Sequence, residues 1–199
     1  DERFELQACF VPLRTDQGEV CALLERLIAH CDDELPPDAR VFAALAAFVR
    51  AGHRFTLLLG NHDVELSLPA VRRALLRRLG ADLPAWVEFL LDGEAYVRGP
   101  VVIEHGNRYD GWNLLDHGGL RALRAALSRD EAPDVAVDVQ PGSRLVAEVM
   151  SPLKARYRFI DLLKPENKVV LPILAALEPA ALAKIDALIP ELVRATRRE

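Results

Sequence analysis

Two short polar segments of this sequence carry residue types that are suited to metal and phosphate chemistry. The first is Gly-Asn-His-Asp at 60–63, and the second begins at His105. The amide oxygen of Asn61 is a ligand type for hard or borderline divalent metals, and an imidazole such as that of His105 suits zinc, manganese or iron. His62 can donate a proton near neutral pH, and Asp63 can orient an imidazole. Together these residues predict a metal-assisted reaction site.

Each segment also has a simpler interpretation. The tetrapeptide alone equally fits a polar turn, because Asn and Asp tolerate turn dihedrals. A single histidine at a strand end is more often a partly buried, hydrogen-bonded residue than a metal ligand. Arg108 follows His105 closely enough to enter the same site, where a guanidinium suits phosphate, but an ion pair with Asp110 fits equally well. The occurrence of two strand-end segments with complementary ligand types nevertheless favours a metal site over these simpler interpretations.

Short apolar runs precede both segments and predict the elements that position them. Phe55–Leu59 reads as a strand buried on both faces, as in α/β sheets, and residues 101–103 read as a second strand. Ligands of α/β folds gather at the carboxyl ends of the strands. Residues 86–91 and 95–98, separated by Asp92-Gly93, predict two further strands joined by a tight turn.

Helical periodicity dominates the rest of the chain. One helix is predicted over 19–31, and a second, capped by Asp38, carries an apolar stripe of Val41, Phe42, Leu45, Phe48 and Val49. Beyond residue 110 we expect helices at 114–128, at 144–163 with a break near Pro152, at 167–177, and from Pro179 onward. In the last of these, one face carries Leu182, Ile185, Ile189 and Leu192. We therefore expect a single α/β domain over 1–199, in which 111–199 forms a mostly helical outer layer or cap.

Composition narrows the class of protein. The chain has 199 residues, of which 51% are hydrophobic and 28% charged, and a net charge of −5. These values are typical of a globular domain. No apolar run reaches the roughly 18 residues of a membrane span, and the acidic balance without a basic block argues against a nucleic-acid-binding patch. Three cysteines without a C-x-x-C motif predict free thiols in a reducing, cytoplasmic setting. Nothing in the sequence indicates an oligomeric state.

The tetrapeptide at 60–63, followed by a strand that ends in His105-Gly106, resembles the calcineurin-like metallophosphoesterase family over residues 54–110. In that family a G-N-H-[DE] motif and a later strand-end histidine belong to a two-metal site between two β-sheets. The resemblance implies a metallophosphoesterase-like sheet sandwich flanked by helices and two divalent ions (Mn, Fe or Zn). It makes Asn61 and His105 ligands of one ion, and His62 the hydrogen-bond or proton donor to the phosphoryl group or leaving oxygen.

Three further motifs of the family do not occur in this sequence: an early D-x-H, a complete G-D-x-x-D or G-D-x-x-E, and a late G-H-x-H. His117, in Asp-His-Gly-Gly at 116–119, is interpreted as a turn residue instead. Two interpretations follow. We expect the chain to be the interior of a longer polypeptide, incomplete at both ends, whose remainder supplies the missing ligands. The alternative is a chain that has lost the chemistry.

The predicted function is therefore a metal-dependent phosphoric ester hydrolase that acts on a phosphorylated small molecule through a two-metal-activated water. His62 and Asp63 are its expected catalytic residues, Asn61 and His105 its metal ligands, and Arg108 its substrate-binding residue. The alternative is a noncatalytic α/β binding module that uses the same strand ends and binds no stoichiometric metal. A serine or cysteine nucleophile has little support, because Ser67 lies in no G-x-S-x-G motif.

Overall fold

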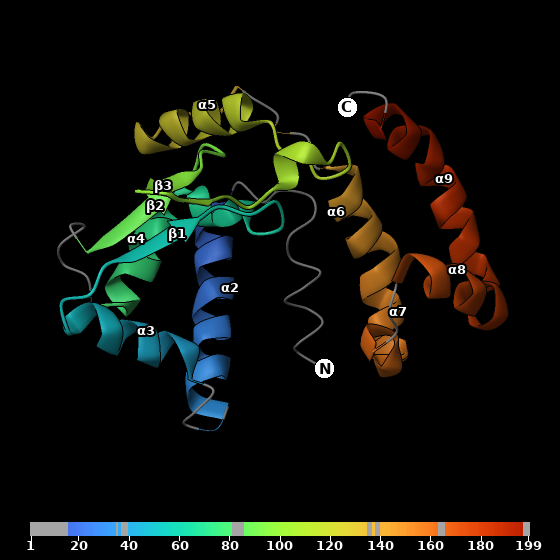
Figure 1. Ribbon diagram of the computed structural model, residues 1–199, viewed down its shortest axis with the longest axis horizontal. Coiled ribbons are helices and arrows are strands. Elements are labelled where there is room, and N and C mark those ends of the chain that lie inside the picture. The colour runs from blue at the N-terminus through green and yellow to red at the C-terminus, as the bar shows by residue number, and fades with distance from the viewer. Residues whose placement is uncertain are drawn as a thin grey trace. The chain divides into compact units, whose positions relative to one another are not determined.

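A computed structural model describes residues 16–34, 36, 40–80, 86–134, 137, 140–162 and 166–196. The chain divides into two compact units. The first, which we call the α/β unit, comprises residues 13–106 and 116–138, and the second, the helical unit, comprises residues 1–12, 107–115 and 139–199. Figure 1 labels the main elements of both.

Within its described part, the α/β unit contains short strands between helices. Its elements are α2 (Gln17–Ala29), η2 (His30–Glu34), α3 (Val41–Arg50), β1 (Phe55–Leu58), η4 (Val64–Ser67), α4 (Pro69–Arg78), β2 (Val87–Leu90), β3 (Tyr96–Arg98), β4 (Val101–Ile103) and α5 (His117–Ser128). Strand β1 pairs with β2 in parallel, in the register Phe55↔Val87. Strand β3 pairs with β4 antiparallel, with Tyr96 opposite Ile103. The chain is thus a mixed α/β protein with small sheets.

The predicted hairpin around Asp92-Gly93 is wrong. β2 and β3 lie where strands were expected, but β2 pairs with β1, and the antiparallel partner of β3 is β4. The residues that reverse the chain between β3 and β4 are Gly99 and Pro100, and Gly99 has the positive φ (57°) that a tight turn favours. Because two turn-like dipeptides flank β3, composition alone did not identify which one closes the hairpin.

The expectation that the first strand is buried on both faces is also wrong. All four residues of β1 are half-buried, and the three residues of β4 are exposed: Val101 by 51%, Val102 by 63% and Ile103 by 49%. In the described part of the unit each sheet consists of two strands, and in the predicted run Phe55–Leu59 only Leu59 is buried. The apolar runs are real strands with incomplete cover.

Two helices of the α/β unit receive their N-terminal caps from residues far away in sequence. The Asp32 carboxylate accepts the Ala43 N–H of α3 at 3.1 Å, and the Gln17 side chain accepts the Ala70 N–H of α4 at 2.7 Å. Each bond satisfies an amide that has no partner within its own helix. Helix α2 packs against α4 (Figure 1), and its buried residues Val20, Leu24 and Ile28 recur at helical spacing.

The prediction for α3 needs two corrections. The N-cap residue is Arg40, without a side-chain bond, and the predicted cap Asp38 lies outside the described residues. The expected apolar stripe is only partly buried: Val49 is buried, whereas Val41 is 55% exposed and Phe48 is 45% exposed. Phe48 stacks on the His53 ring, with ring centroids 4.6 Å apart.

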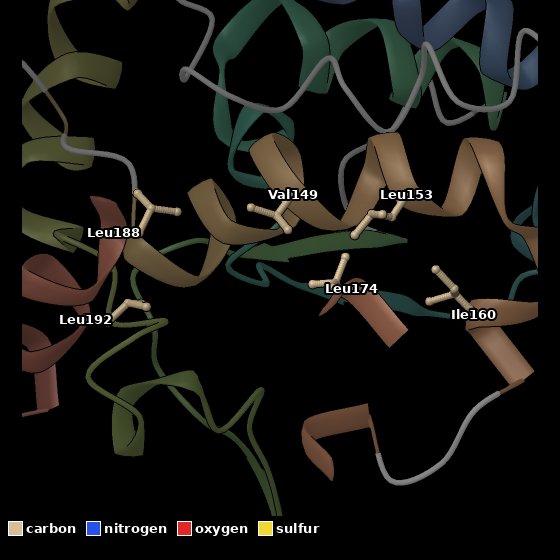
Figure 2. Close-up of a cluster of buried hydrophobic side chains, with 6 residues drawn as sticks. All are labelled: Val149, Leu153, Ile160, Leu174, Leu188 and Leu192. Carbon is tan, nitrogen blue, oxygen red and sulfur yellow. The ribbon is translucent and has the colours of Figure 1, made fainter. Parts of the chain in front are cut away.

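The helical unit packs short helices around one apolar cluster. Its elements are η5 (Asn107–Tyr109), α6 (Pro141–Leu145), η6 (Val146–Met150), α7 (Ser151–Arg156), η7 (Arg158–Leu162), α8 (Glu166–Leu177) and α9 (Pro179–Thr196). The cluster consists of Val149, Leu153, Ile160, Leu174, Leu188 and Leu192 (Figure 2). On α9 the buried face includes Leu188, whereas the predicted Ile189 is 44% exposed. The helix predicted over 144–163 is divided into α6, η6 and α7, and the boundary between η6 and α7, at Ser151, lies next to the predicted break near Pro152. Helix α7 ends at Arg156, before the predicted limit.

Among the described residues, no helix has both the length and the apolar run that crossing a bilayer requires. Cys21 and Cys31 are free thiols. Cys9 lies outside the described residues.

Candidate functional site

The structure brings together Asn61 and His105, which sequence analysis placed at the ends of two strands. Asn61 lies three residues after the end of β1, directly after Gly60, and is 5% exposed; His105 lies two residues after the end of β4. The Nε2 atom of His105 lies 2.8 Å from the Oδ1 atom of Asn61, although 44 residues separate them in sequence. Two strands from different sheets therefore deliver an imidazole and an amide oxygen to one point.

Gly60 is required by this close approach. A Cβ atom at position 60 would lie 3.1 Å from Cε1 and 3.2 Å from Nε2 of His105, and 2.7 Å from Oδ1 of Asp63. Any side chain would therefore push the imidazole or the carboxylate away. Gly106 serves a different purpose, since its φ of 88° lets the chain turn directly after His105.

The chemistry of this contact depends on whether His105 Nε2 carries a proton or a lone pair. An amide Oδ1 carries only lone pairs, so 2.8 Å is a favourable distance when the Nε2–H tautomer of His105 donates a hydrogen bond. With the lone pair on Nε2, the two atoms would repel unless a cation lay against both. Ligand atoms on one metal ion are typically about 3 Å apart, given bonds of about 2.1 Å. The pair thus fits two neighbouring ligands of one ion as well as a hydrogen bond.

His62 and Asp63 lie beside this pair. His62 is exposed at the surface, yet burial of part of its ring lowers its pKa; the Asp63 carboxylate opposes this shift and His105 adds to it. Burial raises the pKa of Asp63, opposed by backbone N–H groups of Gly60 and of Asp63 itself and by the two histidines. The four residues therefore share one electrostatic environment, in which Asp63 can orient an imidazole.

The described residues form no complete metal site. They contain no group of three or more His, Cys, Asp or Glu side chains placed to hold an ion. Asn61 and His105 fit a partial ligand set, consistent with the family motifs that this sequence lacks. Asn61 and His105 are thus two possible ligands and not a complete coordination sphere.

Arg108 and Asp110 belong to the helical unit, in and after η5. The Asp110 carboxylate accepts hydrogen bonds from the Trp112 backbone N–H at 2.9 Å and from the Asn113 side chain at 2.6 Å. Asp110 therefore stabilises its own loop. The role of Arg108 at the site stays a prediction, based on its position three residues after His105.

Sequence analysis missed Asp92 as a residue of interest, because it was assigned to a turn. Arg124 donates to Asp92 Oδ1 at 2.7 Å, and Arg121 Nε lies 3.5 Å from the same oxygen. His117 is the first residue of α5, not part of a turn, and packs on Gly93. The spacing Arg-x-x-Arg on one helix face was the signal that could have indicated this cluster.

Comparison with known proteins adds no family. No protein-family model, curated protein or solved structure matches this chain. The resemblance to the calcineurin-like metallophosphoesterases therefore rests on the residues at 60–63 and at His105 themselves.

Proposed function

We propose that this protein is a metal-dependent phosphoric ester hydrolase of the metallophosphoesterase type, with a sheet sandwich flanked by helices and a phosphorylated small molecule as substrate. One observation carries the proposal: Nε2 of His105 and Oδ1 of Asn61 meet at 2.8 Å from two different strands. The absence of a side chain at Gly60 leaves room for this contact. The free thiols of Cys21 and Cys31 are consistent with action in the cytoplasm.

Each predicted residue has a distinct task in this proposal. Asn61 and His105 would hold one of two divalent ions (Mn, Fe or Zn), which when bound supply Lewis-acid chemistry and a hydroxide near neutral pH. His62 would donate a hydrogen bond or proton to the leaving oxygen, and Asp63 would keep that imidazole in orientation. Arg108 would bind the phosphoryl group through its planar guanidinium. The described residues do not supply the remaining ligands of a two-metal site.

A noncatalytic α/β binding module is the second candidate. The same distance favours it: at 2.8 Å, a hydrogen bond from His105 Nε2–H would satisfy Asn61 Oδ1 directly, without any ion. The described residues also lack a cluster of three acidic, His or Cys ligands. In this case the same strand ends would bind a ligand and leave it chemically unchanged.

Metal content and turnover of the complete polypeptide separate the two candidates. We expect stoichiometric metal after reconstitution with Mn²⁺, and hydrolysis of an aryl phosphate ester that a chelator abolishes. Asn61→Ala and His105→Ala should both lose metal, whereas His62→Ala should keep metal and lose turnover by about 10²–10⁴-fold. His53→Ala is the matched control, because that exposed histidine stacks on Phe48 outside the site. If the protein contains no metal and a chelator does not change its ligand binding, the binding module is the correct candidate.

A further inference from the structure

The carboxyl ends of β1 and β2 lie at the same edge of their sheet. The two strands are parallel, with Leu58 opposite Leu90, and the Leu59 N–H still donates to the Leu90 carbonyl at 3.0 Å. Gly60 therefore leaves β1, and Asp92 leaves β2, at the same edge. This edge is where α/β proteins bind ligands, and the Asn61–His105 pair already occupies one side of it.

Helix α5 brings two arginines to the β2 side of this edge. Arg124 Nη2 donates to Asp92 Oδ1 at 2.7 Å, and Arg121 Nε lies 3.5 Å from that same oxygen. Gly93 packs so closely on the His117 ring that any side chain there would collide with it, which holds the start of α5 near the strand end. One carboxylate therefore faces two guanidinium groups, and the cluster keeps a net positive charge.

The Arg124 side chain has a donor that Asp92 does not use. Its Nη1 atom is buried and has no hydrogen-bond partner among the described residues, and the side chain is only 15% exposed. Buried donors in native proteins are almost always paired with protein, water or an ion, so this group calls for an acceptor. Arg121, at 63% exposure, offers a second guanidinium on the solvent side.

We infer that Asp92, Arg121 and Arg124 form an anion subsite for a second phosphate of the substrate, next to the phosphate held at the Asn61–His105 side. Asp92 orients the two guanidinium groups, and the phosphate oxygens supply the acceptor that Arg124 Nη1 lacks. This inference rests on the proposed function and specifies its substrate class: compounds with two neighbouring phosphates, such as diphosphates. A substrate with one phosphate would leave the subsite unused.

Calorimetric titration of the complete polypeptide with inorganic pyrophosphate and with inorganic phosphate, both in chelator, tests the subsite without any metal. We expect pyrophosphate to bind more tightly than phosphate. Arg121→Gln and Arg124→Lys should each weaken pyrophosphate binding by about tenfold, because Lys cannot form the two-pronged contact. Arg129→Gln is the matched control on the end of the same helix, since Arg129 pairs with Glu131 and should bind like the wild type. Equal affinity for both anions, or unchanged affinity in both variants, would overturn the subsite.

Failure of the subsite and failure of the proposed function give different results. If an aryl phosphate ester is hydrolysed with metal, but KM for a diphosphate ester is the same in the wild type and in Arg121→Gln, only the subsite is refuted. If no hydrolysis occurs while Arg121→Gln weakens pyrophosphate binding, the anion subsite stands and the hydrolase does not. Circular dichroism of each variant checks that it is folded. Arg121→Gln is the variant least expected to unfold, because Arg121 is at the surface.

Discussion

The apolar cluster of the helical unit and the candidate site of the α/β unit are built from different kinds of contact. In the helical unit, six aliphatic side chains from five short elements fill one cluster (Figure 2). In the α/β unit, the candidate site depends on individual atoms, with His105 Nε2 and Asn61 Oδ1 at 2.8 Å above a glycine. Aliphatic packing responds to volume, whereas the site responds to the identity and position of single polar atoms. The comparison predicts that substitutions in the two units will fail in different assays.

The largest expected effect on stability lies in the helical cluster. Leu174 is fully buried, so Leu174→Ala should lower the free energy of unfolding by about 3–5 kcal/mol through lost burial and a residual cavity. Urea denaturation measures it. Leu177→Ala on the same helix is the matched control, because Leu177 is 44% exposed and should cost about 1 kcal/mol or less. Equal losses from the two variants would show that the cluster is not the core of this unit.

Gly60→Ala tests whether the site of the α/β unit depends on close approach. The added Cβ would meet the Asp63 carboxylate and the His105 ring, so we expect a loss of about 1–3 kcal/mol and an altered His105 imidazole environment. Long-range ¹H–¹⁵N spectra of the histidine rings measure the second effect. Gly118→Ala is the control, because its Cβ would meet only Asp116 at 3.4 Å and Ala suits a helix better than Gly. Unchanged His105 signals in Gly60→Ala would contradict the close packing.

The same contrast explains which features were predictable from sequence. Most helix limits could be predicted because they depend on local periodicity: the helices predicted over 19–31 and 167–177 correspond to α2 and α8, within two residues at each end. The proximity of Asn61 and His105 was also expected, because the family resemblance makes both residues ligands of one ion, and the structure confirms the proximity. Their role in binding metal stays a prediction.

What could not be predicted depends on partners distant in sequence. The parallel pairing of β1 with β2 is set by packing between strands, so Asp92-Gly93 looked like a hairpin turn. The caps of α3 and α4 come from Asp32 and Gln17, which no local capping pattern could indicate. On α9, Leu188 is buried in place of Ile189; both positions fit the helical spacing between Ile185 and Leu192, so only the packing partners decide which one is inside.

Asp32→Asn tests one of these distant caps. Asp32 is 5% exposed, its Oδ1 accepts the Ala43 N–H, and its Oδ2 pairs with Arg78. Asparagine keeps one acceptor oxygen but loses the charge that binds Arg78, so we expect a loss of about 1–2 kcal/mol in unfolding free energy. Asp33→Asn is the control at the neighbouring exposed position and should stay within about 0.5 kcal/mol of the wild type. If the two variants denature alike, the contact of Asp32 with Arg78 contributes nothing to stability.

The smallest expected effect concerns a single polar contact inside the helical unit. Trp112 Nε1–H donates to Thr196 Oγ1 at 2.8 Å, and the same hydroxyl donates to the Leu192 carbonyl at 3.0 Å. Thr196→Val keeps the shape but removes both bonds at an exposed position, so the loss should be only about 0.5–1 kcal/mol. Urea denaturation gives the energy, and a shift in tryptophan fluorescence should accompany it because the Trp112 indole loses its partner. Thr196→Ser keeps the hydroxyl and should restore both readouts. A loss several times larger would mean that a single polar contact matters as much in the helical unit as at the candidate site, which would contradict the contrast between the cluster and the site.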